Sequence, residues 1–201
     1  NNGKNCLHGG VKGFDKVIWQ AKAEDTKNGL SVVLTYESKD GDEGFPGNLH
    51  TKVIYTLTDI DELIIDYVAT TDKSTPINLT NHSYFNLTGK NTKNILNHEL
   101  LINANQYAPA NDELIPLGNY ATVKNTPWDF TVPFCIGERI SQINTDPIGY
   151  DHSFILNKNQ ISELAARVKE PLSGRVMEVF TSEPSVQLYT SNFLNGSLKG
   201  K

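Results

Sequence analysis

Apolar and polar side chains alternate along most of this 201-residue chain with a period of two, not the 3.6 residues of a helix. Runs rich in β-branched and aromatic residues recur roughly every eight to thirteen residues, a spacing typical of strands in an all-β domain. The predicted strands cover residues 17–23, 30–36, 49–57, 62–70, 77–87, 99–102, 153–156, 165–169, 176–181 and 186–190.

Turn residues separate these runs. Asn28-Gly29 stands between two of them and predicts a hairpin with a type I′ turn. Other runs end at Asp40-Gly41, Pro46-Gly47 and Ser173-Gly174. Only residues 137–143 and 161–166 have a helical character, and both are short. The pattern therefore predicts one all-β domain over residues 1–201, built as a large antiparallel β-sandwich.

The stretch from residue 106 to 147 departs from this pattern. It holds five of the nine prolines and few alternating runs. We expect a long ordered excursion over the sandwich, with Trp128 and Phe130 as its anchors.

A polar and aromatic strip follows from reading residues 77–87 as a strand. One face then carries Asn78, Thr80, His82, Tyr84 and Asn86. The opposite face, from Phe85 onward, suits a core. Amide, hydroxyl, imidazole and phenol groups together offer the polar contacts and the aromatic surface that a sugar requires. The alternative is an ordinary solvated sheet face.

Three further positions could add to such a site. His8 precedes two glycines, which let the backbone turn sharply and leave the imidazole exposed. Asp151 and His152 are neighbours, so on a strand only one of them faces a given site. Gln187 alternates with apolar residues and faces away from their side. His50 and His98 have no motif around them and are expected at the surface.

Composition and motifs exclude several classes of function. A net charge of −5 without a Lys/Arg cluster disfavours a nucleic-acid partner, and no apolar run is long enough for a membrane span. The chain has only two cysteines, Cys6 and Cys135, and we expect both to be reduced thiols of a cytoplasmic protein. The histidines lack metal-ligand spacing, and phosphate-binding loops and a G-x-S-x-G elbow are absent, so we expect no metal and no cofactor.

Five segments, in order along the chain, resemble the aldose 1-epimerase (galactose mutarotase) family. They are Leu7-His8-Gly9-Gly10 with Gly13, Phe14, Asp15 and Trp19; DGDEGFPGNL at 40–49; NLTNHSYFNL at 78–87; GYDH at 149–152; and SEPSVQLYTSN at 182–192. Each motif alone is moderately specific, but together they cover essentially the whole chain. The resemblance implies the β-sandwich of the galactose mutarotase type.

The resemblance also implies roles for particular residues. His82 corresponds to the general acid that protonates the ring oxygen of the sugar, and His8 to a second active-site histidine that hydrogen-bonds the sugar near the reacting centre. Asp151 corresponds to a carboxylate that binds ring hydroxyls, and Gln187 to a polar residue lining the pocket. The implied reaction interconverts the α and β anomers of free aldohexoses such as galactose and glucose.

Two elements of the family are expected outside residues 1–201. A sugar-anchoring Asn-Arg pair normally precedes the Leu-His-Gly-Gly motif, and the glutamate that acts as general base follows the segment of Gln187. Glu178 and Glu183 do not stand in the matching place. Residues 1–201 are therefore expected to be a central fragment that lacks the N-terminal and C-terminal strands and is nearly inactive by itself.

Three alternatives stay open. The chain could belong to a relative that binds carbohydrate without catalysis. It could belong to a hexose-6-phosphate 1-epimerase, although the phosphate of that substrate calls for several basic residues, and the chain has only Arg139, Arg167 and Arg175. A separate enzyme domain before residue 1 is also compatible with the sequence.

Overall fold

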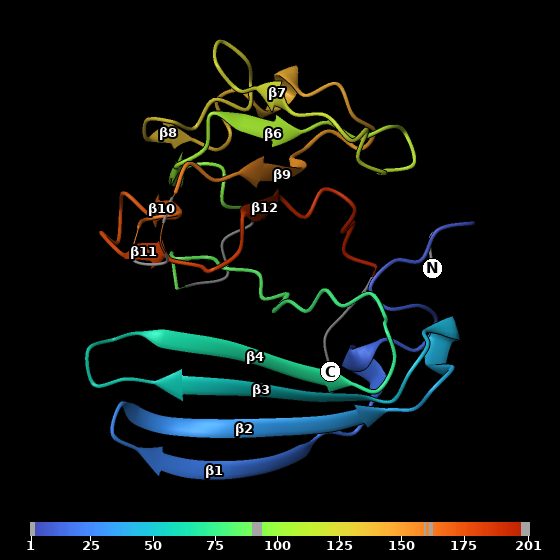
Figure 1. The fold of residues 1–201 in the computed structure, drawn as a ribbon. Helices are drawn as coiled ribbons and strands as arrows, with labels where there is room; N and C mark the ends of the chain where they lie inside the picture. Colours follow the sequence, from blue (N-terminus) through green and yellow to red (C-terminus); the bar gives the residue numbers. More distant parts are fainter. Residues whose placement is uncertain (1–2, 90–93, 159, 161–162, 198–201) are drawn as a thin grey trace. The chain divides into compact units, whose positions relative to one another are not determined.

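The computed structural model describes residues 3–89, 94–158, 160 and 163–197. Within these ranges the chain forms twelve strands and three short 3₁₀ helices, and every strand pairing is antiparallel (Figure 1). The predicted all-β class with antiparallel sheets is confirmed. The chain divides into two compact units, Asn1–His82 and Ser83–Lys201, and each is described by itself.

The first unit is built on a four-stranded meander in the order β1-β2-β3-β4 (Figure 1). Its strands are β1 (Gln20–Thr26), β2 (Gly29–Ser38), β3 (Leu49–Leu57) and β4 (Leu63–Thr71). The 3₁₀ helices η1 (Phe14–Lys16) and η2 (Asp42–Gly44) lie in its loops. The alternation of side chains gives the sheet two different faces.

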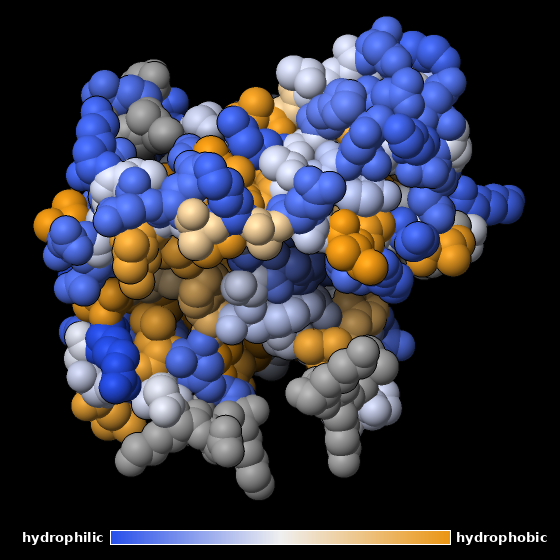
Figure 2. Space-filling model, turned by 90° about the horizontal axis from the view of Figure 1, so that it is seen from below, coloured by the Kyte–Doolittle hydropathy of each residue, from blue (hydrophilic) through white to orange (hydrophobic). Residues whose placement is uncertain are grey.

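One face of this sheet brings Leu30, Leu57 and Leu63 opposite one another on three neighbouring strands. All three leucines are more than half exposed. On the other face, the hydroxyls of Ser31 and Thr56 are buried and 2.8 Å apart. Figure 2 shows apolar groups reaching the surface between hydrophilic ones in one view of the molecule.

The hairpin predicted at Asn28-Gly29 is present, but its turn is not of type I′. Thr26 pairs with Gly29, so Lys27 and Asn28 form the two-residue loop. The positive φ, 131°, falls on Gly29, whereas a type I′ turn needs positive φ at both loop residues. The Thr26 hydroxyl donates to the Gly29 carbonyl at 2.8 Å and closes the turn instead.

The second unit contains two four-stranded sheets (Figure 1). In the order β11-β10-β5-β8, the first consists of Val176–Val179, Ala166–Lys169, Glu99–Ile102 and Phe134–Cys135. In the order β12-β9-β6-β7, the second consists of Ser185–Tyr189, Asp151–Ile155, Gln106–Ala108 and Ala121–Thr122. The 3₁₀ helix η3 (Ile140–Gln142) lies in the segment predicted to have helical character.

Large aromatic side chains form the core of the second unit. Phe130, Tyr150 and Phe154 are at most 1% exposed, and the ring of Phe130 packs edge-on against both other rings. The Tyr150 hydroxyl donates to the Pro127 carbonyl at 2.9 Å, so this buried polar group has a partner. Trp128 stacks on Tyr107 at 4.8 Å. The predicted anchors of the excursion, Trp128 and Phe130, thus both pack against the core.

Two predictions about this part of the chain are wrong. Residues 77–86 form no strand, so the expected alternation of a polar and a core face does not exist there; Phe85 is 53% exposed. His98, expected at the surface, is 2% exposed. Its Nε2 atom accepts a hydrogen bond from the backbone N–H of Leu87 at 3.1 Å. Of the segment 161–166, expected to have helical character, residues 161 and 162 lie outside the described residues; residues 163–166 form no helix, and Ala166 begins β10.

Within the described part of the chain, no helix has the length and apolar character needed to cross a membrane.

Candidate functional site

His8 sits at the tip of a tight turn in the first unit. The backbone N–H of Gly10 donates to the Leu7 carbonyl at 3.2 Å, and His8 and Gly9 between them have φ values of 53° and 86°. The left-handed conformation costs a non-glycine residue about 1–2 kcal/mol. Such local strain is typical of functional sites, where the surrounding structure fixes a side chain in an unusual direction.

The turn is closed tightly behind His8. A Cβ atom at Gly13 would lie 2.4 Å from the carbonyl oxygen of His8, so only glycine fits there without a shift of the backbone. Next along the chain, the rings of Phe14, Trp19 and Tyr36 pack against one another with centroids 5.3–6.0 Å apart. This aromatic cluster ties the segment after the turn to strand β2.

His82 lies in an extended segment that follows β4. The preceding residue is anchored to the sheet, because the side-chain amide of Asn81 donates to the Tyr55 hydroxyl of β3 at 3.0 Å. The imidazole of His82 meets that of His8 edge to face, with ring centroids 5.2 Å apart and an interplanar angle of 69°. The structure therefore brings together the two histidines that the sequence analysis singled out, both of them exposed.

Asp151 and Gln187 form a second pair in the other unit. They lie on neighbouring strands β9 and β12, where Tyr189 pairs with Asp151 and Gln187 with Ser153. Gln187 and Asp151 are therefore diagonal neighbours on one face of the sheet. The Gln187 side-chain amide donates to the Asp151 carboxylate at 2.7 Å.

Aromatic rings border this carboxylate. Tyr84 belongs to the polar and aromatic strip expected from the sequence, whereas Tyr189 and Phe193 were not predicted as site residues. The ring centroids of Tyr84 and Tyr189 are 6.0 Å apart. Phe193 stacks on Tyr189, with ring centroids 6.4 Å apart. Burial raises the pKa of Tyr84, and the neighbouring Tyr189 and Asp151 raise it further. Aromatic faces beside a carboxylate can contact the C–H groups of a sugar while its hydroxyls bind the oxygens.

His152 turns away from Asp151, as strand alternation predicts. Its ring packs against Tyr107 and Trp128, with centroids 5.9 and 5.2 Å away. Burial lowers the pKa of His152, and the nearby Asp151 carboxylate opposes that shift. Its Nδ1 atom accepts a hydrogen bond from the backbone N–H of Asp151 at 3.0 Å, which requires an unprotonated nitrogen. His152 thus packs behind Asp151 as a neutral ring.

A groove of ≈ 590 Å³ lies elsewhere in the first unit and contains neither His8 nor His82. Its lining comes mostly from one face of the four-stranded sheet, including Thr35, His50, Lys52 and Thr70. The groove is therefore separate from the paired histidines. Among the residues that the structure describes, no group of three or more His, Cys, Asp or Glu side chains is arranged to hold a metal ion.

The four predicted site residues thus form two contacting pairs, one in each unit: His8 with His82, and Asp151 with Gln187. That all four act on one sugar stays a prediction. Imidazole, carboxylate, amide and aromatic groups are the kinds of side chain that can bind the hydroxyls and C–H faces of a sugar.

Comparison with known proteins assigns the family. The whole chain, residues 1–201, matches the family described as aldose 1-epimerase, and the chain belongs to this family. It is 47% identical over 201 residues to a galactose mutarotase from Bos taurus, and 39% identical over 200 residues to an aldose 1-epimerase from Escherichia coli strain K12. These alignments cover 100% and 98% of this chain. The chain spans 57% of the length of each relative.

Solved structures give the same assignment for the fold. The galactose 1-epimerase from Lactobacillus acidophilus NCFM matches with a TM-score of 0.85 at 32% identity, over 97% of this chain and 57% of its own. A GalM/aldose epimerase homologue from C. elegans matches with a TM-score of 0.85 at 29% identity, over 96% of this chain and 57% of its own. The predicted fold of the galactose mutarotase type is confirmed.

Proposed function

We propose that the protein containing this chain is an aldose 1-epimerase that interconverts the α and β anomers of free aldohexoses such as galactose and glucose. The observation that carries the proposal is the ring contact between His8 and His82, each of which lies in a motif of the family. The names of its relatives, galactose mutarotase and aldose 1-epimerase, support the same activity.

The reaction consists of two proton transfers. A base removes the proton of the C1 hydroxyl while an acid protonates the ring oxygen, and the ring opens to an aldehyde. Rotation about C1–C2 then lets the ring close on the other face of the aldehyde with the roles reversed. Imidazole suits the acid role because its pKa lies near neutral pH. The proposal involves no cofactor and no metal.

In this proposal each of the four residues has its own task. His82 protonates the ring oxygen, and His8 beside it hydrogen-bonds the sugar near the reacting centre. Asp151, held by Gln187, accepts hydrogen bonds from ring hydroxyls. The general base and the Asn-Arg pair belong to parts of the protein outside residues 1–201. We also propose a cytoplasmic location, which the free thiols of Cys6 and Cys135 support.

Polarimetry on the full-length protein tests the activity. Freshly dissolved α-D-galactose should reach its equilibrium rotation faster with the enzyme, and His82→Ala should slow the enzymatic rate by roughly 10²–10⁴-fold. His50→Ala, an exposed histidine on β3, is the matched control and should leave the rate unchanged. Residues 1–201 alone should be nearly inactive.

The same experiment separates the alternatives. Tight sugar binding without acceleration in the full-length protein would indicate a non-catalytic relative. A strong preference for glucose 6-phosphate over glucose would indicate a hexose-6-phosphate 1-epimerase. Either result would overturn the proposal.

A further inference from the structure

The strained turn of His8 is held from outside by a glutamate far along the chain. Both carboxylate oxygens of Glu43 accept hydrogen bonds from the backbone, one from the N–H of Val11 at 2.7 Å and one from the N–H of Lys12 at 3.0 Å. Two adjacent N–H groups bound by one carboxylate fix the direction of the chain directly after the turn, because charge-assisted hydrogen bonds are the stronger kind.

The same carboxylate fills the space beside the turn. A Cβ atom at Gly10 would lie 2.2 Å from the Glu43 Oε2 atom and 2.9 Å from its Cδ atom. A side chain at Gly10 would therefore displace the Glu43 carboxylate, and the φ of 107° at this position independently favours glycine. Glu43 itself has a φ of 50°, so both partners of the contact adopt left-handed backbone.

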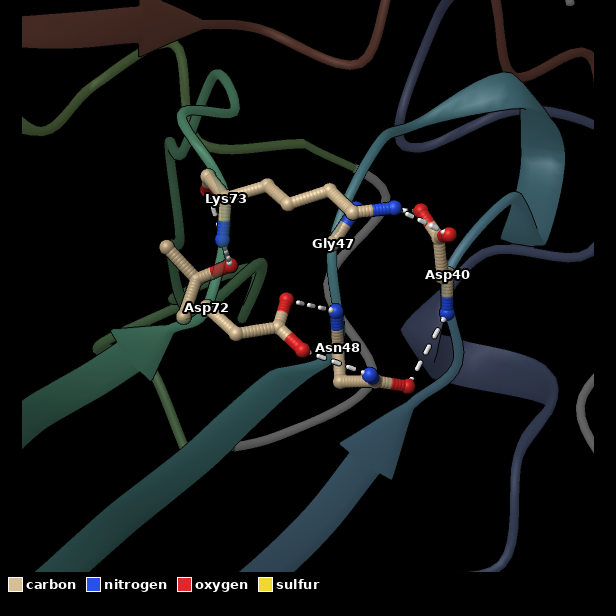
Figure 3. A network of polar contacts seen from close by, with 6 residues as sticks. Asp40, Gly47, Asn48, Asp72 and Lys73 are labelled. Atoms are coloured by element: carbon tan, nitrogen blue, oxygen red, sulfur yellow. Dashed lines mark hydrogen bonds and ion pairs between the residues drawn. The ribbon is translucent and has the colours of Figure 1, made fainter.

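The loop that presents Glu43 is anchored at its base by a polar network (Figure 3). The Asp40 carboxylate accepts a hydrogen bond from the Gly47 N–H at 2.6 Å and pairs with the ammonium group of Lys73. Asn48 donates from its backbone and from its side-chain amide to Asp72, both at 2.7 Å. The two ends of the loop are thus tied to the segment that follows β4.

These interactions favour the ionised form of both carboxyl groups in the network. The pairing with Lys73 lowers the pKa of Asp40, and the Gly47 N–H lowers it further. The two hydrogen bonds from Asn48 lower the pKa of Asp72. Both anchors are therefore charged near neutral pH, and the loop offers Glu43 a fixed base from which to reach the turn.

We propose that Glu43 is a positioning residue for the reaction: by holding the N–H groups of Val11 and Lys12 it fixes the turn that keeps the imidazole of His8 against that of His82. This role rests on the proposed function, because His8 is assigned to the sugar there. Glu43 does not contact the reacting atoms in this proposal; it acts through His8.

The experiment compares four variants of the full-length protein: Glu43→Gln, Glu43→Ala, His8→Ala and the double variant Glu43→Ala/His8→Ala. Glu62→Ala, an exposed glutamate near the β3–β4 turn, is the matched control. We expect Glu43→Ala to lower kcat by about 10–10²-fold, as small displacements of catalytic groups do, with a much smaller change in KM. Glu43→Gln, which keeps one acceptor oxygen, should lower kcat by a smaller factor.

The double variant decides whether the effect passes through His8. Once His8 is removed, the loss of Glu43 should lower kcat no further. An equal loss in the presence and absence of His8 would overturn the proposal, as would an unchanged kcat in Glu43→Ala. The thermal unfolding midpoint, measured in parallel, should remain high enough that every variant is folded at the assay temperature.

NMR spectroscopy separates this proposal from the proposed function. The amide resonances of Val11 and Lys12 and the imidazole resonances of His8 should shift in Glu43→Ala and keep their wild-type positions in Glu62→Ala. If the full-length protein proved inactive, the proposed function would fail while these resonances still decided whether Glu43 positions the turn. Unchanged His8 resonances in Glu43→Ala would refute it.

Discussion

The amide of Gln187 and the carboxylate of Asp151 are joined by a 2.7 Å hydrogen bond across strands β12 and β9. The bond occupies Oδ1 of Asp151 and fixes the orientation of the carboxylate plane. Two paired strands therefore present the remaining acceptor sites in a defined direction, and under the proposed function a sugar hydroxyl would meet a preorganised partner there.

Removing this bond should weaken substrate binding more than catalysis. Gln187→Leu keeps a similar volume but leaves Asp151 without its donor, and we expect KM for galactose to rise by roughly 10-fold, the value of one hydrogen bond to a charged group. Steady-state kinetics on the full-length protein measures it. Gln142→Leu, an exposed glutamine in η3, is the control. An unchanged KM in Gln187→Leu would remove Gln187 from the binding site.

The ring contact between His8 and His82 makes their contributions interdependent. A double-mutant cycle with His8→Ala, His82→Ala and the double variant should give a coupling energy between about 0.5 and 3 kcal/mol in kcat/KM, as contacting residues do. The free-energy effects of substitutions at independent sites add to within about 0.5 kcal/mol. Additive losses would show that the two histidines act separately, although their centroids are 5.2 Å apart.

Strands whose side chains pack against their neighbours could be predicted from the sequence. The prediction of 49–57 coincides with β3 and that of 99–102 with β5, because both segments are rich in β-branched residues and leucine, although the three apolar residues of β5 follow one another without alternation. The predicted strand 17–23 is shifted by three residues against β1, Gln20–Thr26. There the backbone is directed by the aromatic cluster of Phe14, Trp19 and Tyr36, which periodicity does not reveal.

The prediction of a strand at 77–87 was wrong because a two-residue alternation of side chains is not sufficient to form a strand. Its polar groups are satisfied by contacts other than a ladder: Asn81 donates to Tyr55, the Asn86 side chain accepts from Thr88, and Leu87 donates to His98. Asparagine and threonine favour such local alternatives to sheet hydrogen bonds. The motif around His82 was nevertheless informative, since it identified the histidine that the structure places beside His8.

Glu43 could not be assigned a role from the sequence, although it lies in one of the matched motifs. Its partners, the N–H groups of Val11 and Lys12, precede it by more than thirty residues and belong to the backbone, which carries no sequence signal. The left-handed conformation of Glu43, which lies between Asp42 and Gly44, is visible only in the structure.

The core of the second unit should depend strongly on Phe130. Its side chain is 1% exposed and packs against Tyr150 and Phe154, so Phe130→Ala should lower the free energy of unfolding by about 3–5 kcal/mol through lost burial and a cavity. Phe180→Ala, at a phenylalanine that is 51% exposed, should cost less than about 1 kcal/mol. Equal losses in urea unfolding would contradict this assignment of the core.

Buried His98 gives stability a dependence on pH. Burial lowers its pKa, and the Glu170 carboxylate and the Ile95 backbone partly oppose the shift. The unfolded chain, in which histidine has a pKa of about 6.5, therefore binds a proton before the folded protein does. Neutral His98 makes its full contribution to the free energy of unfolding above about pH 6.5. This contribution is lost as the pH falls toward the lowered pKa of His98 in the folded state.

The structural cost of protonating His98 is the loss of its acceptor. A protonated Nε2 cannot accept the N–H of Leu87, which lies 3.1 Å away. We therefore expect the free energy of unfolding, measured in urea, to fall between about pH 7.5 and 5.5 in the wild-type protein.

His98→Gln keeps an amide oxygen as acceptor without a titrating group, so its decrease over this range should be smaller. His152, whose pKa burial also lowers, supplies the part that persists. His50→Gln, at an exposed histidine, should retain the wild-type decrease. The range stays above the region where Glu170 titrates, because the hydrogen bonds from Ser173 lower the pKa of that carboxyl. A His98→Gln protein with the full wild-type decrease would show that another group is responsible.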